Sequence, residues 1–301
     1  MKIPPYLKPG DTIGIICPAG YMPLEKAQTA INVLQEWGFK VVTGITVGNQ
    51  HNYFSGTDEE RLSDIQEMMD DNSINAILCA RGGYGTGRII ERINFKKFKK
   101  HPKWVIGFSD ITILHCHLFT NYKIASLHAP MAAAFNDEQY TNEFVQSLHE
   151  ALSGKKSQIR SAPHPFNKPG AVKGTLVGGN LSLLAHIVGT TSDINTNNKI
   201  LFIEDIGEYI YNVDRMLYQL KRNGKLERLG GLIVGGFTEM KDTEIPFGKS
   251  IEEVIRDVVE EYSFPVCYSF PVSHEKENYA LKQGLKYKLI VKKERTTLQE
   301  L

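Results

Sequence analysis

The sequence predicts an α/β protein in which an open, doubly wound parallel sheet forms the first half and a smaller α/β domain the second. Three observations predict this class. Short apolar runs rich in β-branched residues alternate with helical patterns, and turn residues follow most of these runs. The chain has 301 residues, which favours two domains over one.

The first β-α-β unit is the clearest pattern in the chain. Thr12–Cys17 reads as a buried strand that ends at Pro18-Ala19-Gly20. Apolar residues recur with helical spacing from Glu25 to Trp37, and Lys40–Val42 is the next strand. A strand, a helix and a second strand in this order predict parallel pairing through a right-handed crossover.

The same alternation continues through the first half. Thr57 or Asp58 is expected to cap a helix that runs to about Asp71. The further strands are expected at Ala76–Ala80, Trp104–Phe108 and Ile124–Leu127. In open parallel sheets ligands bind beyond the carboxyl ends of the strands, where the loops 17–21, 81–87 and 107–110 would lie.

A change of character near residue 153 predicts the domain boundary. Residues 153–170 have little periodicity and hold three prolines, so we expect an N-terminal domain at 1–152, a linker at 153–170 and a C-terminal domain at 171–301. In the second half, Gly178-Gly179-Asn180 reads as a glycine turn that opens a helix. Strands are expected at Ile200–Ile203, Gly231–Gly236, Val266–Phe270 and Lys286–Lys292, and helices at Val213–Leu220 and Ser250–Tyr262.

Composition excludes several classes of function. Apolar residues make up 42% and charged residues 23% of the chain, and the formal net charge is +1, so nucleic-acid binding is not indicated. No apolar run reaches the length of about 18 residues that a membrane span needs, and the N-terminus has no apolar signal segment. The four cysteines lie far apart and read as buried reduced thiols, which indicates a cytoplasmic protein.

Ser109 is the first candidate for chemistry. It stands between the strand Trp104–Phe108 and a helix that opens at Asp110, where the nucleophile elbows of hydrolases stand. Gly107 allows a close crossing, but Ile111 occupies the position of the second glycine of that motif. Serine is also a preferred N-cap, so from these residues alone Ser109 is either a cap or a nucleophile.

A glycine-rich loop follows the third predicted strand. In Arg81-Gly82-Gly83-Tyr84-Gly85 the backbone can turn sharply and offer N–H groups to an anion. The spacing matches neither nucleotide-phosphate motif. The loop is therefore either a plain turn or an oxyanion or carboxylate site, in which Arg81 is a candidate for binding a substrate carboxylate.

The second half offers an acid and a base. Glu204 ends a buried strand, and it is favoured over Glu208 because the strand end fixes its position. His274 lies in an irregular loop after the strand Val266–Phe270, which is typical of functional groups, and His128 is a second candidate. His115 and His117 are two apart on a helix and face away from each other. No metal-ligand motif is present in the sequence, so no catalytic metal is expected.

With these residues in view, the chain resembles the LD-carboxypeptidase family of serine peptidases, which includes muramoyltetrapeptide carboxypeptidases and microcin C self-immunity peptidases. The resemblance covers almost the whole length. The segments that carry it are Cys17-Pro18-Ala19-Gly20, Phe54-Ser55-Gly56-Thr57 with Arg61, Arg81-Gly82-Gly83-Tyr84-Gly85, Gly107-Phe108-Ser109-Asp110, Gly174-Thr175-Leu176, Gly178-Gly179-Asn180-Leu181, Leu201-Phe202-Ile203-Glu204-Asp205 with Asp214-Arg215-Met216-Leu217, and Ser273-His274 to Gly284.

The resemblance implies a role for each candidate. Ser109 would be the nucleophile, His274 the general base and acid, and Glu204 the group that orients His274. The N–H of Asp110, with one from Gly82-Gly83, would form the oxyanion hole. The resemblance also implies a flavodoxin-like N-terminal domain, a smaller swivelling C-terminal domain, a site in the cleft between them, no metal or cofactor, and a homodimer.

The implied substrate is a small peptide with an L,D bond, such as the bond before the terminal D-Ala of a murein tetrapeptide. Cys17 stands where the family more often has a small apolar residue such as Ala. The chain is short for the microcin-immunity branch, which favours the murein branch. Two alternatives stay open: an immunity-type peptidase that acts on peptidyl or aminoacyl nucleotides, and a non-catalytic two-domain peptide-binding protein.

Overall fold

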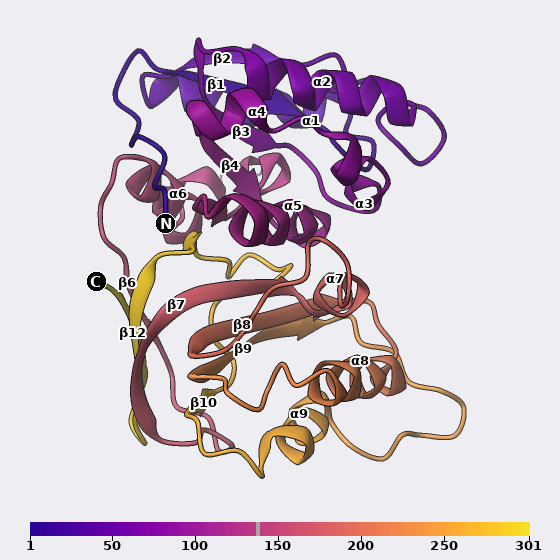
Figure 1. Cartoon of the computed structure of the whole chain (residues 1–301), viewed down its shortest axis with the longest axis vertical. Coiled ribbons are helices and arrows are strands. Elements are labelled where there is room, and N and C mark those ends of the chain that lie inside the picture. The colour runs from indigo at the N-terminus through magenta and orange to yellow at the C-terminus, as the bar shows by residue number, and fades with distance from the viewer. Residues whose placement is uncertain (137–138) are drawn as a thin grey trace. The chain divides into compact units, whose positions relative to one another are not determined.

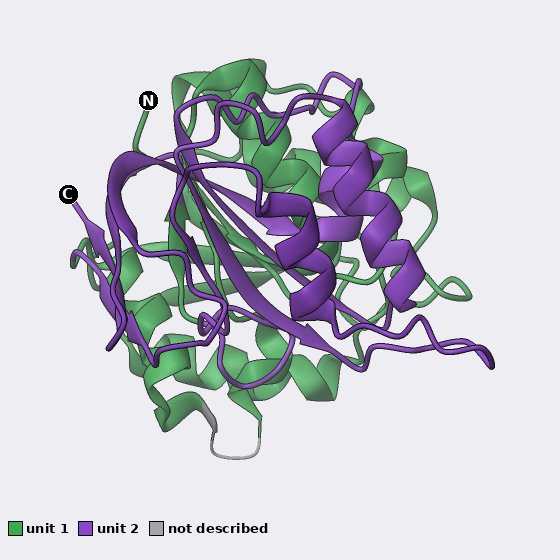
Figure 2. Cartoon of the chain, turned by 90° about the horizontal axis from the view of Figure 1, so that it is seen from below, with its two compact units in different colours: residues 1–155, 279–282 green, residues 156–278, 283–301 purple. Residues whose placement is uncertain are grey.

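The structure of the protein, a computed structural model, describes residues 1–136 and 139–301 and divides into two units (Figures 1 and 2). Unit 1 comprises Met1–Lys155 together with Tyr279–Lys282. Unit 2 comprises Lys156–Asn278 and Gln283–Leu301. The chain therefore returns to the first unit for one short segment near its C-terminal end.

Unit 1 is built on a six-stranded sheet with the order β11-β5-β4-β3-β1-β2. The strands are β1 (Thr12–Ile16), β2 (Lys40–Thr43), β3 (Ile74–Cys79), β4 (Trp104–Gly107), β5 (Ser126–His128) and β11 (Leu281–Gln283). The pairs from β2 to β5 are all parallel. The order 2-1-3-4-5 is that of flavodoxin-like folds, and it confirms the predicted doubly wound sheet.

The helices of unit 1 include those that the sequence predicts at Glu25–Trp37, from Thr57 or Asp58 to about Asp71, and after Asp110. They are α1 (Leu24–Glu36), α2 (Asp58–Asp70), α3 (Thr86–Ile89), α4 (Lys96–Lys100), α5 (Thr112–His117) and α6 (Glu143–Leu152), with short turns η1 (Ile90–Arg92), η2 (Ser109–Ile111), η3 (Leu118–Tyr122), η4 (Ala132–Phe135) and η5 (Gln139–Thr141). Thr57 caps α2 in a capping box with Glu60, which selects Thr57 over Asp58. Trp37 at the end of α1 stacks on His149 of α6, while α2 contacts α3 and α4.

Unit 2 is built on a seven-stranded mixed sheet with the order β10-β9-β8-β7-β12-β13-β6. Its strands are β6 (Gln158–Ser161), β7 (Gly170–Asn180), β8 (Lys199–Ile206), β9 (Gly231–Thr238), β10 (Val266–Cys267), β12 (Lys286–Val291) and β13 (Thr296–Glu300). The strands from β7 to β10 are parallel, and β12 pairs antiparallel with β7 and β13. This mixed sheet confirms the α/β class of the second half.

The helices of unit 2 follow the parallel strands. They are α7 (Leu181–His186), α8 (Ile210–Arg222) and α9 (Ile251–Val259). The predicted glycine turn at 178–180 is wrong, because β7 continues to Asn180, whose side chain then caps α7. Among the described residues, no helix has both the length and the apolarity to cross a membrane.

Candidate active site

Ser109 follows β4 directly and has the backbone geometry of an elbow. Its φ angle is +62°, a left-handed conformation that costs a non-glycine residue free energy and is concentrated at functional sites. The cap position of η2 is Phe108, and no side chain caps this turn. The Ser109 side chain is half-buried. The serine is therefore not the N-cap that the sequence left open, and its geometry is that of a nucleophile elbow.

The glycine loop of residues 81–85 packs directly against this elbow. A Cβ atom built on Gly82 would lie 2.9 Å from the Cβ of Ser109 and 3.3 Å from the amide nitrogen of Asp110. The carbonyl of Gly82 in turn accepts a hydrogen bond of 3.0 Å from the N–H of Gly20. The three loops that the sequence assigns to one edge of the sheet are thus in contact.

Asp110 fastens the loop to the elbow. Its buried carboxylate accepts a hydrogen bond of 2.8 Å from the N–H of Thr86, the first residue of α3. Burial raises the pKa of this carboxyl, and the hydrogen bonds from Thr86 oppose the rise.

Behind the elbow, Nε2 of the fully buried His115 lies 2.8 Å from the carbonyl oxygen of Gly107. Burial lowers the pKa of His115 to about 4, so this histidine is neutral and structural.

Arg61 is a residue of this site that motif reasoning did not single out. Its side chain is fully buried and donates hydrogen bonds to the carbonyls of Pro18, at 2.7 Å, and Gly85, at 3.0 Å. It also pairs with Asp58 at the start of α2. The guanidinium therefore holds the loops after β1 and β3 together. In the sequence, Arg61 belongs to no recognised motif, and only the family resemblance includes it, together with Phe54-Ser55-Gly56-Thr57.

Arg81 is exposed at the edge of the same loop. A Cβ atom built on Gly20 would lie 3.6 Å from its Nε, so the guanidinium group borders the junction of the loops. Unit 1 thus brings together Arg81, Gly82, Gly83, Ser109 and Asp110, all of which the sequence predicted as site residues.

Unit 2 brings together the predicted acid and base. His274 Nδ1 lies 2.5 Å from Glu204 Oε2, although the two residues come from different elements. Glu204 lies in the buried part of β8 and its side chain is completely inaccessible, whereas the imidazole keeps 11% of its surface exposed. A buried carboxylate behind a partly exposed imidazole orients that ring and stabilises its protonated form.

A β-bulge makes room for this pair. Ile203 pairs with Val234 and Asp205 with Phe237, so Glu204 alone faces Gly235 and Gly236 of β9. A Cβ atom on Gly235 would lie 2.1 Å from the carbonyl oxygen of Val272. The two glycines therefore let the segment before His274 cross directly over the strand ends.

Ser273 shapes the loop that carries the imidazole. Its hydroxyl donates to the carbonyl of Glu277 at 3.1 Å and accepts from the N–H of Glu275 at 3.0 Å. These two bonds close a tight loop around His274, so the position of the ring does not depend on its own contacts alone.

The electrostatics of the pair suit a general base. Burial alone lowers the pKa of His274, but the hydrogen bond and the negative charge of Glu204 outweigh it, and the pKa lies above its usual value of 6.5. Burial raises the pKa of Glu204, while the hydrogen bond from His274 opposes that rise.

The other candidates have structural contacts. Glu208 lies 3.3 Å from the Ser182 hydroxyl and accepts from the Asn212 amide at 3.1 Å, so it is Glu204 that contacts His274. His128, at the end of β5, is fully buried. Within residues 1–136 and 139–301, no three histidine, cysteine or acidic side chains gather as metal ligands.

A strained serine at a strand–helix junction and a carboxylate-bound imidazole at strand ends are the components of serine peptidases. Comparison with known families narrows this class. The LD-carboxypeptidase N-terminal domain matches residues 13–129, and the LD-carboxypeptidase C-terminal domain matches residues 173–289.

Individual relatives agree with the family match. The chain is 38% identical to a probable murein peptide carboxypeptidase of Bacillus subtilis over 94% of this chain and 90% of that one. It is 28% identical to the murein tetrapeptide carboxypeptidase of Pseudomonas aeruginosa, over 90% and 91%. The crystal structure of a muramoyltetrapeptide carboxypeptidase from Oxalobacter formigenes superposes with a TM-score of 0.87 at 31% identity, covering 96% of this chain and 98% of that one.

A microcin C7 self immunity protein shares the fold, with a TM-score of 0.88 at 23% identity over 100% of this chain and 99% of that one.

The two family matches and the murein peptide carboxypeptidase of Bacillus subtilis show that the chain belongs to the LD-carboxypeptidase family. It is a serine-type LD-carboxypeptidase.

Proposed function

We propose that Ser109, His274 and Glu204 form a catalytic triad that removes the terminal D-Ala from murein tetrapeptides. The observation that carries the proposal is the 2.5 Å contact between His274 Nδ1 and Glu204. Because Nδ1 is engaged with the carboxylate, Nε2 is the nitrogen that exchanges a proton with serine. The left-handed backbone of Ser109 supports its role as the nucleophile of the triad.

The reaction then follows the logic of serine hydrolases. Ser109 Oγ attacks the carbonyl carbon of the L,D bond, and its proton passes to His274 Nε2. The tetrahedral intermediate collapses as the imidazolium gives that proton to the amine of the leaving D-Ala. Water, deprotonated by the same imidazole, hydrolyses the acyl-enzyme and frees Ser109. The mechanism requires the serine Oγ and His274 Nε2 to lie about 2.6–3.2 Å apart when substrate is bound.

The loops around Ser109 would stabilise and orient the substrate. We assign the N–H of Asp110 and an N–H of the Gly82-Gly83 segment to the oxyanion hole, since Gly82 lies directly against Asp110 and Ser109. Arg81 would bind the substrate's terminal carboxylate, because its exposed guanidinium borders the same loop junction and can form two parallel hydrogen bonds.

The choice of substrate rests on the relatives. The Bacillus and Pseudomonas proteins carry murein peptides in their names, and the Oxalobacter structure is that of a muramoyltetrapeptide carboxypeptidase. The identity to the first of these, 38% over nearly the whole chain, exceeds the 23% to the microcin C7 protein.

The test is release of D-Ala from murein tetrapeptide by the wild-type protein and by Ser109→Ala. We expect the wild type to release D-Ala and the variant to lose about a thousandfold or more of this activity. An unchanged Ser109→Ala rate, or a wild type inactive on every L,D substrate, contradicts the proposal. A D,D-linked peptide of the same composition is the control substrate.

A second candidate is hydrolysis of an aminoacyl or peptidyl nucleotide, as in microcin immunity. The rings of Tyr209 and Tyr211 are exposed and stack with centroids 5.5 Å apart, which is a surface suited to a nucleobase. Competing an aminoacyl-sulfamoyl adenosine against murein tetrapeptide in the same assay decides between the two, because the preferred substrate has the higher kcat/KM.

We further propose that the protein is cytoplasmic and forms a homodimer. All four cysteines are buried and reduced, which fits a reducing compartment. The homodimer follows from the family resemblance. Light scattering after size exclusion tests the assembly, and fractionation of the source cells tests the location.

A further inference from the structure

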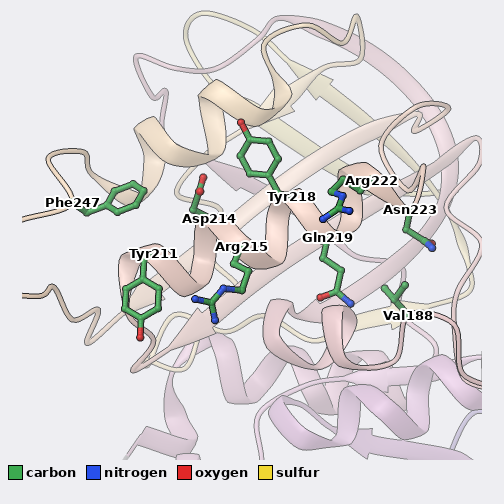
Figure 3. Close-up of a pocket in the computed structure, with 9 residues that line it drawn as sticks. All are labelled: Val188, Tyr211, Asp214, Arg215, Tyr218, Gln219, Arg222, Asn223 and Phe247. Carbon is green, nitrogen blue, oxygen red and sulfur yellow. The ribbon is translucent and has the colours of Figure 1, made fainter.

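Exposed tyrosine rings occur in both units. In unit 2, Tyr211 and Tyr218 line a groove along α8 (Figure 3). Cations of the same helix lie against both rings, with Arg215 5.2 Å from the centre of the Tyr211 ring and Lys221 5.7 Å from that of Tyr218. In unit 1, Tyr53 is 56% exposed and lies between β2 and α2. Its surroundings differ, because it borders the glycine loop beside the proposed nucleophile.

The hydroxyl of Tyr53 lies against Gly83. A Cβ atom built on Gly83 would be 2.9 Å from Tyr53 Oη and 3.6 Å from Cζ of the ring. The φ angle of Gly83 is +95°, so both the backbone and the neighbouring ring require a glycine at this position. A Cβ atom on the preceding residue, Gly82, would lie 2.9 Å from the Cβ of Ser109. Tyr53 and Ser109 therefore border consecutive residues of one loop.

Hydrogen bonds fix the backbone around Tyr53. The N–H groups of His51 and Phe54 each donate to the carbonyl of the other, at 2.8 and 3.0 Å, and close a turn that contains Tyr53. The carbonyl of Tyr53 accepts a hydrogen bond of 3.2 Å from the N–H of Tyr21, which joins the turn to the loop after β1. The ring of Phe54 lies 4.9 Å from the guanidinium of Arg61. The exposed phenol of Tyr53 is thus carried by a well-anchored turn.

The Tyr53 hydroxyl can donate to a ligand. Among the residues that the structure describes, no side chain or backbone group is hydrogen-bonded to it. Arg81 borders the same place, because a Cβ atom on Gly20 would lie 3.6 Å from its Nε, and the Cα of Gly20 lies 3.6 Å from the Cβ position of Gly83. The phenol and the guanidinium therefore border the same two neighbouring glycines. A carboxylate accepts hydrogen bonds from both kinds of donor.

The spacing along the loop suits the end of a carboxypeptidase substrate. In such a substrate the terminal carboxylate follows the attacked carbonyl by one residue, which is about 3.3–3.6 Å along an extended chain. Consecutive Cα atoms of the loop are about 3.8 Å apart. A substrate whose carbonyl lies at Ser109, beside Gly82, can therefore bring its carboxylate level with Gly83, where the Tyr53 hydroxyl lies.

We infer that Tyr53 donates a hydrogen bond to the terminal carboxylate of the substrate, beside Arg81, and thereby selects peptides with a free C-terminus. The inference rests on the proposed function, because it names a further binding residue of that site. The carboxylate is ionised in the ground state and in the transition state alike. Loss of this hydrogen bond should therefore raise KM and leave kcat unchanged.

The experiment compares murein tetrapeptide with the same peptide amidated at its C-terminus. We expect Tyr53→Phe to raise KM for the tetrapeptide about tenfold with kcat within about twofold, because a hydrogen bond to a charged group is lost. On the amide, whose C-terminus is uncharged, Tyr53→Phe should match the wild type. Tyr6→Phe is the matched control, since its 39% exposed ring stacks on Trp104 at the start of β4, whereas Ser109 follows the end of that strand.

Two kinetic results overturn the inference. One is an unchanged KM of Tyr53→Phe for the tetrapeptide, and the other is an equal loss of kcat/KM on the acid and on the amide, which is the effect of a displaced glycine loop. A melting curve shows that each variant is folded.

Binding separates this inference from the proposed function. Ser109→Ala, with and without Tyr53→Phe, is titrated with the tetrapeptide and with its amide, and binding is followed by NMR. If the wild type cleaves no L,D substrate, the proposed function fails, and a preference for the acid that Tyr53→Phe removes still supports the carboxylate site. Equal affinity of Ser109→Ala for the acid and the amide contradicts the inference.

Discussion

Gly82 and Ser109 lie so close together that a side chain at position 82 would meet the serine at 2.9 Å from its Cβ and 3.2 Å from its Oγ. The glycine loop is therefore part of the wall around the nucleophile. This contact explains why a glycine occupies a position whose φ angle does not demand one.

Gly82→Ala should therefore lower activity through crowding. We expect kcat/KM for D-Ala release to fall at least about tenfold, since the new methyl group displaces Ser109 or Asp110, and stability to fall by about 1–3 kcal/mol. Gly10→Ala is the control, because its φ of +92° imposes strain where no atom lies within 4 Å. It should lose stability and keep activity, and a fully active Gly82→Ala would contradict the assignment of this loop.

Arg61 and Arg88 give a matched pair, because both bind Asp58. Arg61 is fully buried and also satisfies two carbonyls, so Arg61→Met should reduce the free energy of unfolding by about 2–4 kcal/mol. Arg88 is 46% exposed, and Arg88→Ala should cost about 1 kcal/mol or less. Urea unfolding measures both. Equal losses of unfolding free energy would mean that the ion pair with Asp58 accounts for the stabilisation, and that the hydrogen bonds from Arg61 to the loop carbonyls do not.

A third prediction concerns Gly235, which lies in the bulge of β9. Gly235→Ala places a methyl group 2.1 Å from the Val272 carbonyl, so the segment that leads to His274 must move. We expect kcat/KM to fall by about a hundredfold, because a displacement of about 1 Å in a catalytic group has this effect. Gly224→Ala in the same unit has a φ of +73° and only ordinary contacts, and it should keep its activity. Steady-state kinetics and a melting curve for each variant check this.

Much of the fold could be predicted because local signals agree with it. Thr57 and Asp58 as candidate caps predict the start of α2, and the apolar run at Trp104 predicts β4 and the junction at Ser109. The residue types at strand ends also predicted Glu204 and His274 as candidates. Their pairing came from the family resemblance, since seventy positions separate them and no local pattern links two such residues.

The features that were not predicted depend on contacts between distant segments. β11 has three residues, too few to show a period, and its neighbour β5 lies far earlier in the chain. Gly178-Gly179 suggested a turn because glycines favour turns, yet a Cβ atom on Gly178 would lie 2.0 Å from the Phe202 carbonyl. The glycine at position 178 therefore allows the close approach of β7 to its neighbour β8. The role of Arg61 is likewise visible only once its two loops are adjacent.

The pH dependence of the reaction should report the contact between His274 and Glu204. The imidazole acts as a base only when it is neutral, so kcat/KM should fall as the pH drops through its pKa, which Glu204 holds above 6.5. Glu204→Gln removes the negative charge while burial remains, so the acidic limb should move to lower pH and kcat should fall by about three to four orders of magnitude.

The stability of the fold should depend on pH in the opposite direction to kcat/KM, falling as the pH rises. A pKa that is raised in the folded state means that the protonated imidazole stabilises the fold. This contribution is complete below pH 6.5, the value for an ordinary histidine, and is lost as the pH rises through the raised pKa. Unfolding free energies measured across this range should therefore decline with pH in the wild type, and the decline should vanish in Glu204→Gln. In the kinetic measurement, an acidic limb of kcat/KM at the same pH in the wild type and in Glu204→Gln would show that Glu204 does not set the basicity of His274.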